Sequence, residues 1–95
     1  MSQELICQAV KDRRTIKFSY DNREIVLAPY WVYRKSPTGP VFVAGLKPEG
    51  NVPMTIFLID DISSVEITNN TFMLDVSLNP DEMGHEHIIC AVEKD

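Results

Sequence analysis

Aromatic and cationic side chains are interleaved in one short segment of the chain, Tyr-Trp-Val-Tyr-Arg-Lys. Successive side chains of a strand point to opposite faces, so Trp31, Tyr33 and Lys35 would share one face. Tyr30 and Arg34 would lie on the other. Aromatic rings beside cations suit the stacking of nucleic-acid bases with phosphate contacts, worth about 1–3 kcal/mol per stacked base. The alternative is that one face of the segment supplies core and the other shields the surface.

A second group of cations, Arg13, Arg14, Lys17 and Arg23, lies at the end of an expected helix and in the hairpin that follows it. These four side chains could form an anion site or a docking face. Cations near a helix C-terminus are also routine partners of the helix dipole. The alternative interpretation is that these side chains serve the helix alone.

Two further combinations of residues have the side chains that metal binding or catalysis uses. His85, His87 and Cys90 are close in sequence, but zinc sites usually draw on two paired ligand clusters and only one is present. We therefore expect a mobile, solvated tail there and no metal. Asp60 and Asp61 are adjacent, so on a strand they point to opposite faces and are not predisposed to act as paired carboxylates.

The sequence contains neither a nucleophile with spaced histidine and acid partners nor a glycine-rich phosphate loop. It therefore predicts a protein that is not an enzyme and carries no cofactor. The chain has 95 residues, which corresponds to one domain. No apolar run approaches the roughly 18 residues of a membrane span.

Charge is distributed unevenly along the chain, whose formal net charge is -5. Residues 1–50 carry eight basic and five acidic side chains, whereas residues 51–95 carry nine acids and Lys94 as the one basic residue. This asymmetry suggests one mildly basic and one acidic face, or a solvated surface without a partner. The acidic balance argues against strong non-specific duplex binding.

The two cysteines, Cys7 and Cys90, lie near opposite ends of the chain. The N-terminus lacks the basic segment and apolar stretch of a signal peptide, so we expect a cytoplasmic protein with reduced thiols. A bridge between the two cysteines stays open, because sequence alone does not place their Cα atoms within bonding range.

The hydrophobic pattern predicts one helix followed by short strands. A helix is expected over residues 3–13, where apolar residues recur at helical spacing, and the period then changes to that of strands. Asp21-Asn22 and Asn69-Asn70 are expected turns, and Pro29 should mark a bend or an edge. The segment from His87 to Val92 fits either an edge strand or a short helix. Strands are expected over residues 16–20, 24–28, 30–35, 41–46, 54–59, 64–68 and 72–78, with loops over 36–40 and 47–53.

One helix and several strands at this spacing predict a mostly β domain with a small, highly curved antiparallel sheet. Closure into a barrel would remove the exposed edges of such a sheet. We expect a single domain with the barrel over about residues 15–78 and an acidic C-terminal segment over 79–95. The expected core residues include Phe18, Phe57, Val65 and Ile67.

Several motifs, taken in order, resemble the WYL domain over about residues 5–68. The first is Ile6-x-x-Ala9-Val10-x-x-x-Arg14, followed by Ile16-x-Phe18-x-Tyr20, Pro29-Tyr30 and Phe57-Leu58-Ile59-Asp60-Asp61-Ile62. The resemblance implies an Sm-like, SH3-type β-barrel behind an N-terminal α-helix. It also implies a regulatory role, because WYL domains usually belong to bacterial transcriptional regulators, where they are thought to sense ligands such as nucleic acids or nucleotides.

The chain is a divergent example of this pattern. The Trp-Tyr-Leu strand that names the family corresponds to Val41-Phe42-Val43. The family's ligand-binding arginines correspond to Ile25, Leu58 and Asp61, so the guanidinium groups that recognise phosphate are missing. No helix-turn-helix accompanies the barrel in this sequence.

The function we expect is a non-enzymatic regulatory module that binds a protein partner or a small ligand. A stand-alone binder of single-stranded nucleic acid and a homo-oligomeric structural or interaction protein are the alternatives. A membrane is not an expected partner. The candidate binding residues are Tyr20, Arg23, Tyr30, Trp31, Tyr33, Arg34 and Lys35.

Overall fold

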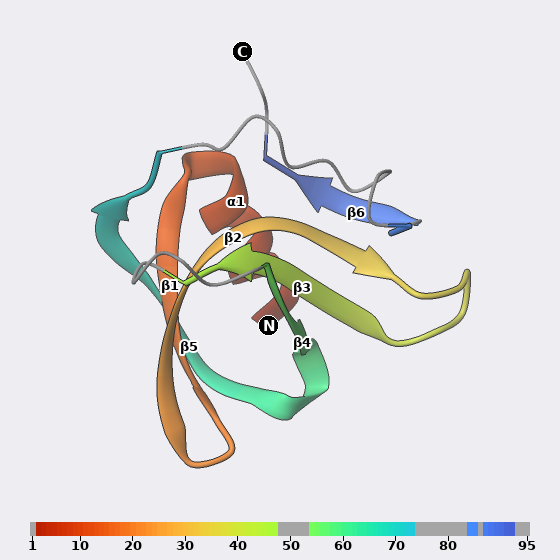
Figure 1. Cartoon of the computed structure of the whole chain (residues 1–95), viewed down its shortest axis with the longest axis horizontal. Helices are drawn as coiled ribbons and strands as arrows, with labels where there is room; N and C mark the ends of the chain where they lie inside the picture. The colour runs from red at the N-terminus through yellow and green to blue at the C-terminus, as the bar shows by residue number, and fades with distance from the viewer. Residues whose placement is uncertain (1, 48–53, 74–83, 86, 93–95) are drawn as a thin grey trace.

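The computed structural model describes residues 2–47, 54–73, 84–85 and 87–92 (Figure 1). Within these described residues a helix comes first, and six strands with one 3-10 turn follow it. The elements are α1 (Ser2–Asp12), β1 (Arg14–Tyr20), β2 (Arg23–Arg34), β3 (Val41–Leu46), β4 (Thr55–Leu58), η1 (Ile59–Asp61), β5 (Ile62–Thr71) and β6 (Ile88–Ala91).

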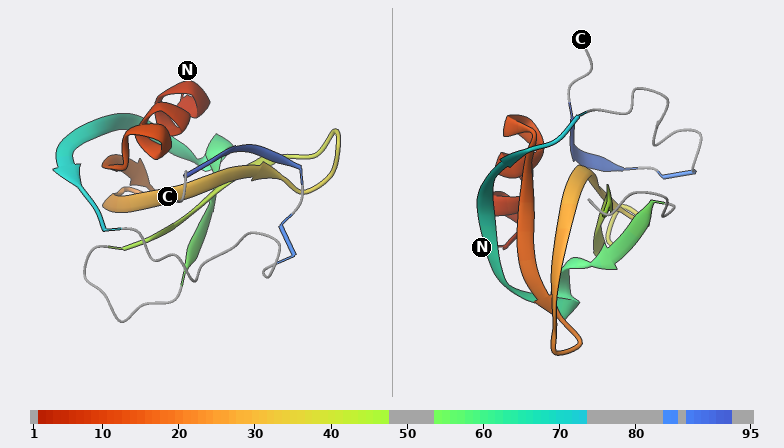
Figure 2. Two further views of the ribbon diagram at one scale, coloured as in Figure 1. Left: turned by 90° about the horizontal axis from the view of Figure 1, so that it is seen from above. Right: turned by 60° about the vertical axis from the view of Figure 1, so that its left-hand side comes forward.

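The expected helix forms α1, and its apolar stripe is its buried face. Ile6, Ala9 and Val10 are buried, while Glu4 in the first turn and Lys11 in the last turn complement the helix dipole. The helix packs against β1, β2 and β5 and also contacts β6 (Figure 2). Burial of this one stripe attaches α1 to the sheet.

The first hairpin is confirmed at the turn that its sequence indicates. Asp21 and Asn22 both have positive φ, 51° and 60°, and Tyr20 pairs with Arg23 across the two-residue loop. Two successive residues with positive φ match the right-handed twist of the flanking strands, and Asp and Asn tolerate that conformation. The local sequence therefore determines the register of β1 against β2.

Pro29 lies within β2, which runs from Arg23 to Arg34, so the two strands expected over residues 24–28 and 30–35 are a single strand. Along one edge of β2, β1 pairs as far as Leu27 and β6 pairs from Trp31. Pro29 falls between these two ladders, where a missing N–H is tolerated. The bend or edge expected at Pro29 corresponds to a register shift of β2 against β3 between Pro29 and Trp31.

The strands form one antiparallel sheet in the order β4-β3-β2-β1-β5, with β6 added beside β2. The mostly β, antiparallel part of the prediction is therefore confirmed. Closure into a barrel is not confirmed, because β4 and β5 end this order and no ladder between them is present in the described residues. The short turn η1 connects these two strands, and it contains Asp60 and Asp61, where the sequence predicts that the strand ends.

The core lies between α1 and the curved sheet, and it contains Phe18 and Phe57 as predicted. The ring of Phe57 makes edge contacts with Phe18 and with Tyr20, at centroid distances of 5.2 Å and 5.0 Å. Val65 and Ile67 are only partly buried and pack against the edge of the core.

Gly45 marks the closest approach of two strands in this core. A Cβ at Gly45 would lie 2.4 Å from the carbonyl oxygen of Ala28 and 2.9 Å from Cγ of Leu27. A backbone atom cannot move aside as a flexible side chain can, so only glycine fits at this position of the ladder between β3 and β2.

The turn expected at Asn69-Asn70 is wrong, because β5 continues to Thr71. The ladder continues past these residues: Thr71 pairs with Arg14, and the N–H of Phe72 donates to the carbonyl of Arg13. Most of the strand expected over 72–78 lies outside the described residues. At the end of the chain, the alternative between helix and strand is decided, since Ile88–Ala91 form β6.

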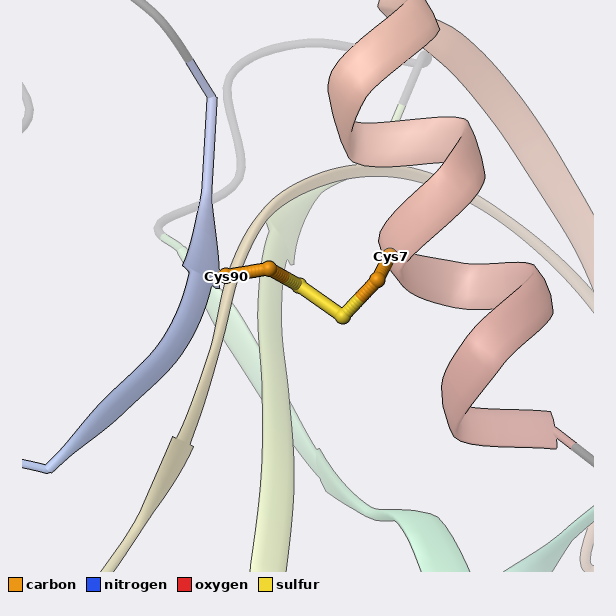
Figure 3. Close-up of a disulfide and its surroundings, with 2 residues drawn as sticks. All are labelled: Cys7 and Cys90. Carbon is orange, nitrogen blue, oxygen red and sulfur yellow. A yellow bond between two sulfur atoms is a disulfide. The ribbon is translucent and has the colours of Figure 1, made fainter.

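The expectation of two free thiols is also wrong, because Cys7 and Cys90 form a disulfide (Figure 3). β6 pairs with β2 and so carries Cys90 beside α1. The Cα atoms of the two cysteines lie 5.8 Å apart, within the range that a disulfide spans. The bond joins elements that are 83 residues apart in sequence.

Candidate functional site

The aromatic residues of the 30–35 segment lie inside the protein rather than on its surface. The exposed fractions of Tyr30, Trp31 and Tyr33 are 1%, 1% and 8%. This part of β2 pairs with β3 along one edge and with β6 along the other, and α1 packs against the strand as well. No ring of this segment therefore offers an open face on which a base could stack.

His85 covers the indole of Trp31, although we expected this part of the chain to be a solvated tail. Nε1 of Trp31 donates a hydrogen bond to Nδ1 of His85 over 2.9 Å, and the imidazole stacks on the ring of Tyr33 with centroids 4.1 Å apart. Burial lowers the pKa of His85 below its ordinary value and raises the pKa of the Tyr33 phenol. Both shifts favour the neutral forms that this packing requires.

The other candidate binding residues do not meet in one place. Tyr20 and Arg23 lie beside the hairpin turn at the start of β2, and Tyr20 packs on the core. Arg34 and Lys35 lie at the opposite end of β2, where the guanidinium of Arg34 donates to the carbonyl of Gly39 over 3.1 Å. The candidate binding residues therefore lie partly in the core and partly at the two opposite ends of β2.

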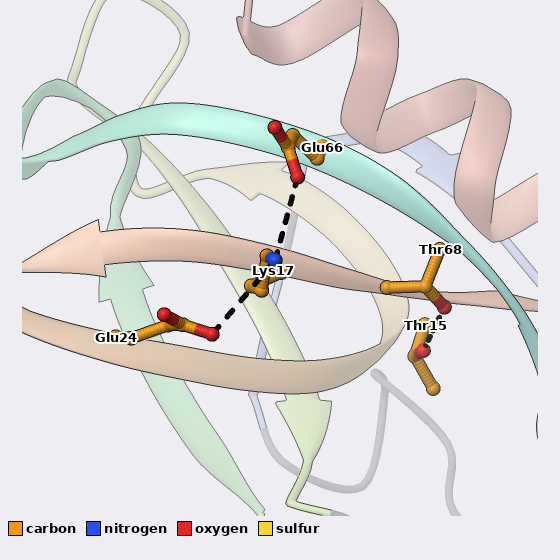
Figure 4. Close-up of polar contacts among 5 residues, drawn as sticks. All are labelled: Thr15, Lys17, Glu24, Glu66 and Thr68. Atoms are coloured by element: carbon orange, nitrogen blue, oxygen red, sulfur yellow. Dashed lines mark hydrogen bonds and ion pairs between the residues drawn. The ribbon is translucent and has the colours of Figure 1, made fainter.

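The second cationic group is partly neutralised by neighbouring acids. Nζ of Lys17 lies 3.6 Å from Glu66 and 3.9 Å from Glu24, which come from the strands on either side of β1 (Figure 4). Both acids and the lysine are well exposed, so these pairs add little stability. They do, however, place two carboxylates beside the lysine of this group and lower the positive potential around it.

A concave pocket of about 410 Å³ lies on another part of the sheet. Val26, Ala28 and Tyr30 contribute to it from alternate positions of β2, which point to the same face. β1, the end of β3 and the end of β5 supply the walls. The described residues that line the pocket are Thr15, Val26, Ala28, Tyr30, Leu46, Lys47, Asn70, Thr71, Phe72 and Met73.

The lining of the pocket is mainly apolar, with a few polar groups. The rings of Tyr30 and Phe72 are stacked with centroids 5.4 Å apart, and the Tyr30 hydroxyl donates to the carbonyl of Met73 over 3.4 Å. The hydroxyl of Thr15 is paired with that of Thr68 (Figure 4). Lys47 is the cation among the described lining residues. A planar apolar group with a negatively charged end matches this surface.

Sequence reasoning missed this pocket because its walls come from segments that are far apart in the chain. One signal was present. Residues 25–28 read Ile-Val-Leu-Ala, an apolar run on both faces of a strand, which indicates that both faces are covered or line a hollow. Ile25 and Leu27 face the core cluster, and Val26 and Ala28 face the pocket.

A second hollow at the hairpin end is polar and more open. It is lined by Ser19, Asp21, Asn22, Arg23, Glu24, Asp61 and Ser63. Three acids against one arginine make it a poor receptor for phosphate. Among the residues described, no group of three or more histidine, cysteine or acidic side chains is arranged to hold a metal ion.

Comparison of the chain with known protein families, with curated proteins and with solved structures gives no match. In the part of the chain that the structure describes, no helix is long and apolar enough to span a membrane.

Proposed function

We propose that the chain is a non-enzymatic regulatory module that binds a small ligand and belongs to the WYL-like, Sm- or SH3-type barrels in a half-open form. The leading helix, the hairpin and the turn η1 between the last two strands of the main sheet support the fold part of this proposal. The long strand β2, which pairs with β1, β3 and β6, bends the sheet in the way that such barrels require.

The observation that carries the functional part is the pocket of about 410 Å³ beside Tyr30. It combines a mainly apolar lining with a few polar groups, which is the usual composition of a small-molecule site. Lys47 in the lining favours a ligand with a carboxylate, sulfonate or phosphate group. The ligand class we propose is therefore a small amphiphile with a flat apolar body and one anionic end.

Single-stranded nucleic acid loses its main support as an alternative ligand. Tyr30 and Trp31 are buried, so the stacking surface that this reading needs is already filled by the protein. The positions of the family arginines carry Ile25, Leu58 and Asp61 in this chain, and Asp61 would repel a phosphate.

The proposal is tested with 8-anilinonaphthalene-1-sulfonate, a probe with a flat apolar body and one sulfonate. We expect saturable binding of one probe per chain. Lys47→Glu should weaken it about five- to tenfold, as reversal of one partly exposed charge implies. Lys11→Glu is the matched control, because Lys11 is exposed on α1 and does not line the pocket.

An equal loss of affinity in both lysine variants would show that the effect comes from the net charge of the protein, and it would contradict a site beside Lys47. The near-ultraviolet circular dichroism has to stay native throughout, because partly unfolded chains also bind this probe.

We also propose that the protein acts in the cytoplasm. Cytosolic disulfides are usually transient and redox-sensing rather than structural. Fractionation of the producing cells, followed by thiol labelling of the two cysteines, tests this location. Recovery of a fully oxidised protein outside the cytoplasm would contradict it.

A further inference from the structure

The C-terminal half of β2 is covered by a short segment from the end of the chain, which we call the strap and define as residues 84–85 and 87–92. Its strand β6 pairs with β2, placing Ala91 opposite Trp31 and Cys90 opposite Val32. Two further backbone bonds extend this contact: the N–H of Val92 donates to the carbonyl of Tyr30 over 2.7 Å, and the N–H of Arg34 donates to the carbonyl of His87 over 3.1 Å. The strap thereby completes one edge of the sheet and covers Trp31.

The strap buries little apolar surface of its own. Ile88 and Ile89 are 39% and 36% exposed, Ala91 is exposed, and Val92 is the buried apolar residue at its end. A four-residue strand with so few buried side chains is weakly held by packing alone. The covalent bond between Cys90 and Cys7 is therefore the strongest single attachment of the strap to the rest of the domain (Figure 3).

The disulfide is accessible from the surface. Cys7 and Cys90 are half-buried and border a shallow hollow whose other lining residues are Glu4, Gln8, Lys11 and Ala91. A thiolate can reach such a bond from the solvent. A buried structural disulfide would not offer this access.

We infer that the Cys7–Cys90 disulfide is a redox-controlled clasp over a strand-addition surface, the edge of β2 at Trp31, Val32 and Tyr33. A dithiol reductant opens it by thiol–disulfide exchange: its first thiolate attacks one protein sulfur and releases the other as a thiolate, and its second thiolate then attacks the mixed disulfide and releases the first protein sulfur. The reductant becomes a cyclic or linked disulfide, and the two protein cysteines gain two electrons and two protons. The strap then leaves the edge of β2.

The occupant that we assign to the vacated edge is the strap of a second copy of this chain. The edge already pairs in register with this sequence, so a second copy carries a segment that fits it without any change. Sixteen residues connect Thr71 to Ile88. Fully extended they span about 50 Å, which exceeds the longest dimension of the domain, 29 Å. Reciprocal exchange between two chains gives a closed, symmetric dimer.

The first test uses Trp31, the one tryptophan of the chain, as a reporter. In the oxidised protein iodide should quench it poorly, since its exposed fraction is 1%. The protein is then reduced with dithiothreitol at a low micromolar protein concentration. The constant for quenching of Trp31 by iodide should rise at least threefold, while the far-ultraviolet circular dichroism keeps its β signal. Near millimolar concentration, light scattering should give the mass of two chains, and Trp31 should again be shielded.

The second test detects exchange of the strap directly. Cys7→Ser chains keep only the cysteine of the strap, and Cys90→Ser chains keep only the cysteine of α1. Neither variant can close the bond within one chain, but a mixed exchanged dimer brings one cysteine of each kind together. Mixing the two variants at high concentration and then oxidising them should give a disulfide-linked heterodimer, in large excess over the homodimers that each variant forms alone.

Three results would overturn the inference. One is a reduced chain in which Trp31 stays shielded at low concentration, since the strap would then hold without the bond. Another is loss of the whole β signal on reduction, because the disulfide would then support the entire domain. The third is a yield of heterodimer no higher than that of the homodimers. Binding of the sulfonate probe beside Lys47 does not depend on the exchange, so failure of either proposal is recognised separately.

Discussion

The indole N–H of Trp31 donates to Nδ1 of His85, a contact between residues 54 positions apart in sequence. The indole N–H only donates, so Nδ1 has to be unprotonated to accept it. The same imidazole stacks on Tyr33. His85 therefore covers a fully buried aromatic residue of β2 and satisfies its one polar atom.

The state of His85 predicts that the strap depends on pH. Burial lowers the pKa of this imidazole in the folded chain below its ordinary value of 6.5. The free strap then takes up a proton before the docked strap does. The contribution to stability is complete above about pH 6.5 and is lost as the pH falls below it. Acidification should therefore shift and broaden the Trp31 emission before the sheet unfolds.

Two histidine variants separate this effect from general acid denaturation. His85→Gln should abolish the change in Trp31 emission between pH 7 and pH 5. His87→Gln is the matched control, because His87 is exposed and the histidine that contacts the rings of Trp31 and Tyr33 is His85. An unchanged pH response in His85→Gln would show that another group governs the docking of the strap.

Truncation of Phe57 tests the core. Phe57 is 7% exposed and contacts the rings of Phe18 and Tyr20, so Phe57→Ala should lower the free energy of unfolding by about 3–5 kcal/mol. Ile56→Ala is the control, because Ile56 is the neighbouring residue of β4 and is 42% exposed. Urea denaturation measures both. Equal effects of the two substitutions would contradict the observed register of β4.

The close approach of Gly45 in β3 to the backbone of β2 predicts that this position tolerates no side chain. Gly45→Ala should lower the free energy of unfolding by about 1–3 kcal/mol, the usual cost of overpacking, because its Cβ would press on the backbone oxygen of Ala28. At Gly39 the nearest atom to an added Cβ is the flexible hydroxyl of Ser36, so Gly39→Ala should cost less. Thermal melts of both variants check this order, and a reversed order would refute the close approach.

The burial of Trp31 predicts a flat response to single-stranded nucleic acid. A titration of the oxidised protein with short oligothymidine at low salt should leave the emission of Trp31 unchanged, because its ring has no open face. The same titration at moderate salt is the control for non-specific attraction. Saturable quenching that weakens with salt would instead support the alternative hypothesis, a binder of single-stranded nucleic acid.

Features that depend on neighbouring residues could be predicted from the sequence. The helix, the turn at Asp21 and Asn22 and the strand Val41–Leu46 agree with their local patterns. The same reasoning wrongly divided β2 into two strands at Pro29, because propensity alone does not show that two separate ladders leave a gap at this position. It also erred at Asn69 and Asn70, since the pairing of β5 with β1 overrides their preference for a turn.

Features that depend on long-range contacts could not be predicted. The sequence of residues 30–35 leaves core and binding surface open as alternatives, because the burial of Trp31 depends on pairing of β2 with β3 and β6 and on His85, 54 residues away. The disulfide is a second example, because its cysteines are brought together only when β6 docks. The pocket beside Lys47 is a third, since its lining comes from four strands and the residues that follow the last of them.

The central claim is that the pocket beside Tyr30 binds a small anionic amphiphile. A titration of isotope-labelled protein with 8-anilinonaphthalene-1-sulfonate, followed by amide chemical shifts, tests it most directly. We expect saturable shifts concentrated at Val26, Ala28, Lys47 and Phe72, with the amides of α1 and the hairpin turn unaffected. Shifts spread evenly over the sheet, or confined to the acidic hollow around Asp21 and Asp61, would contradict the account.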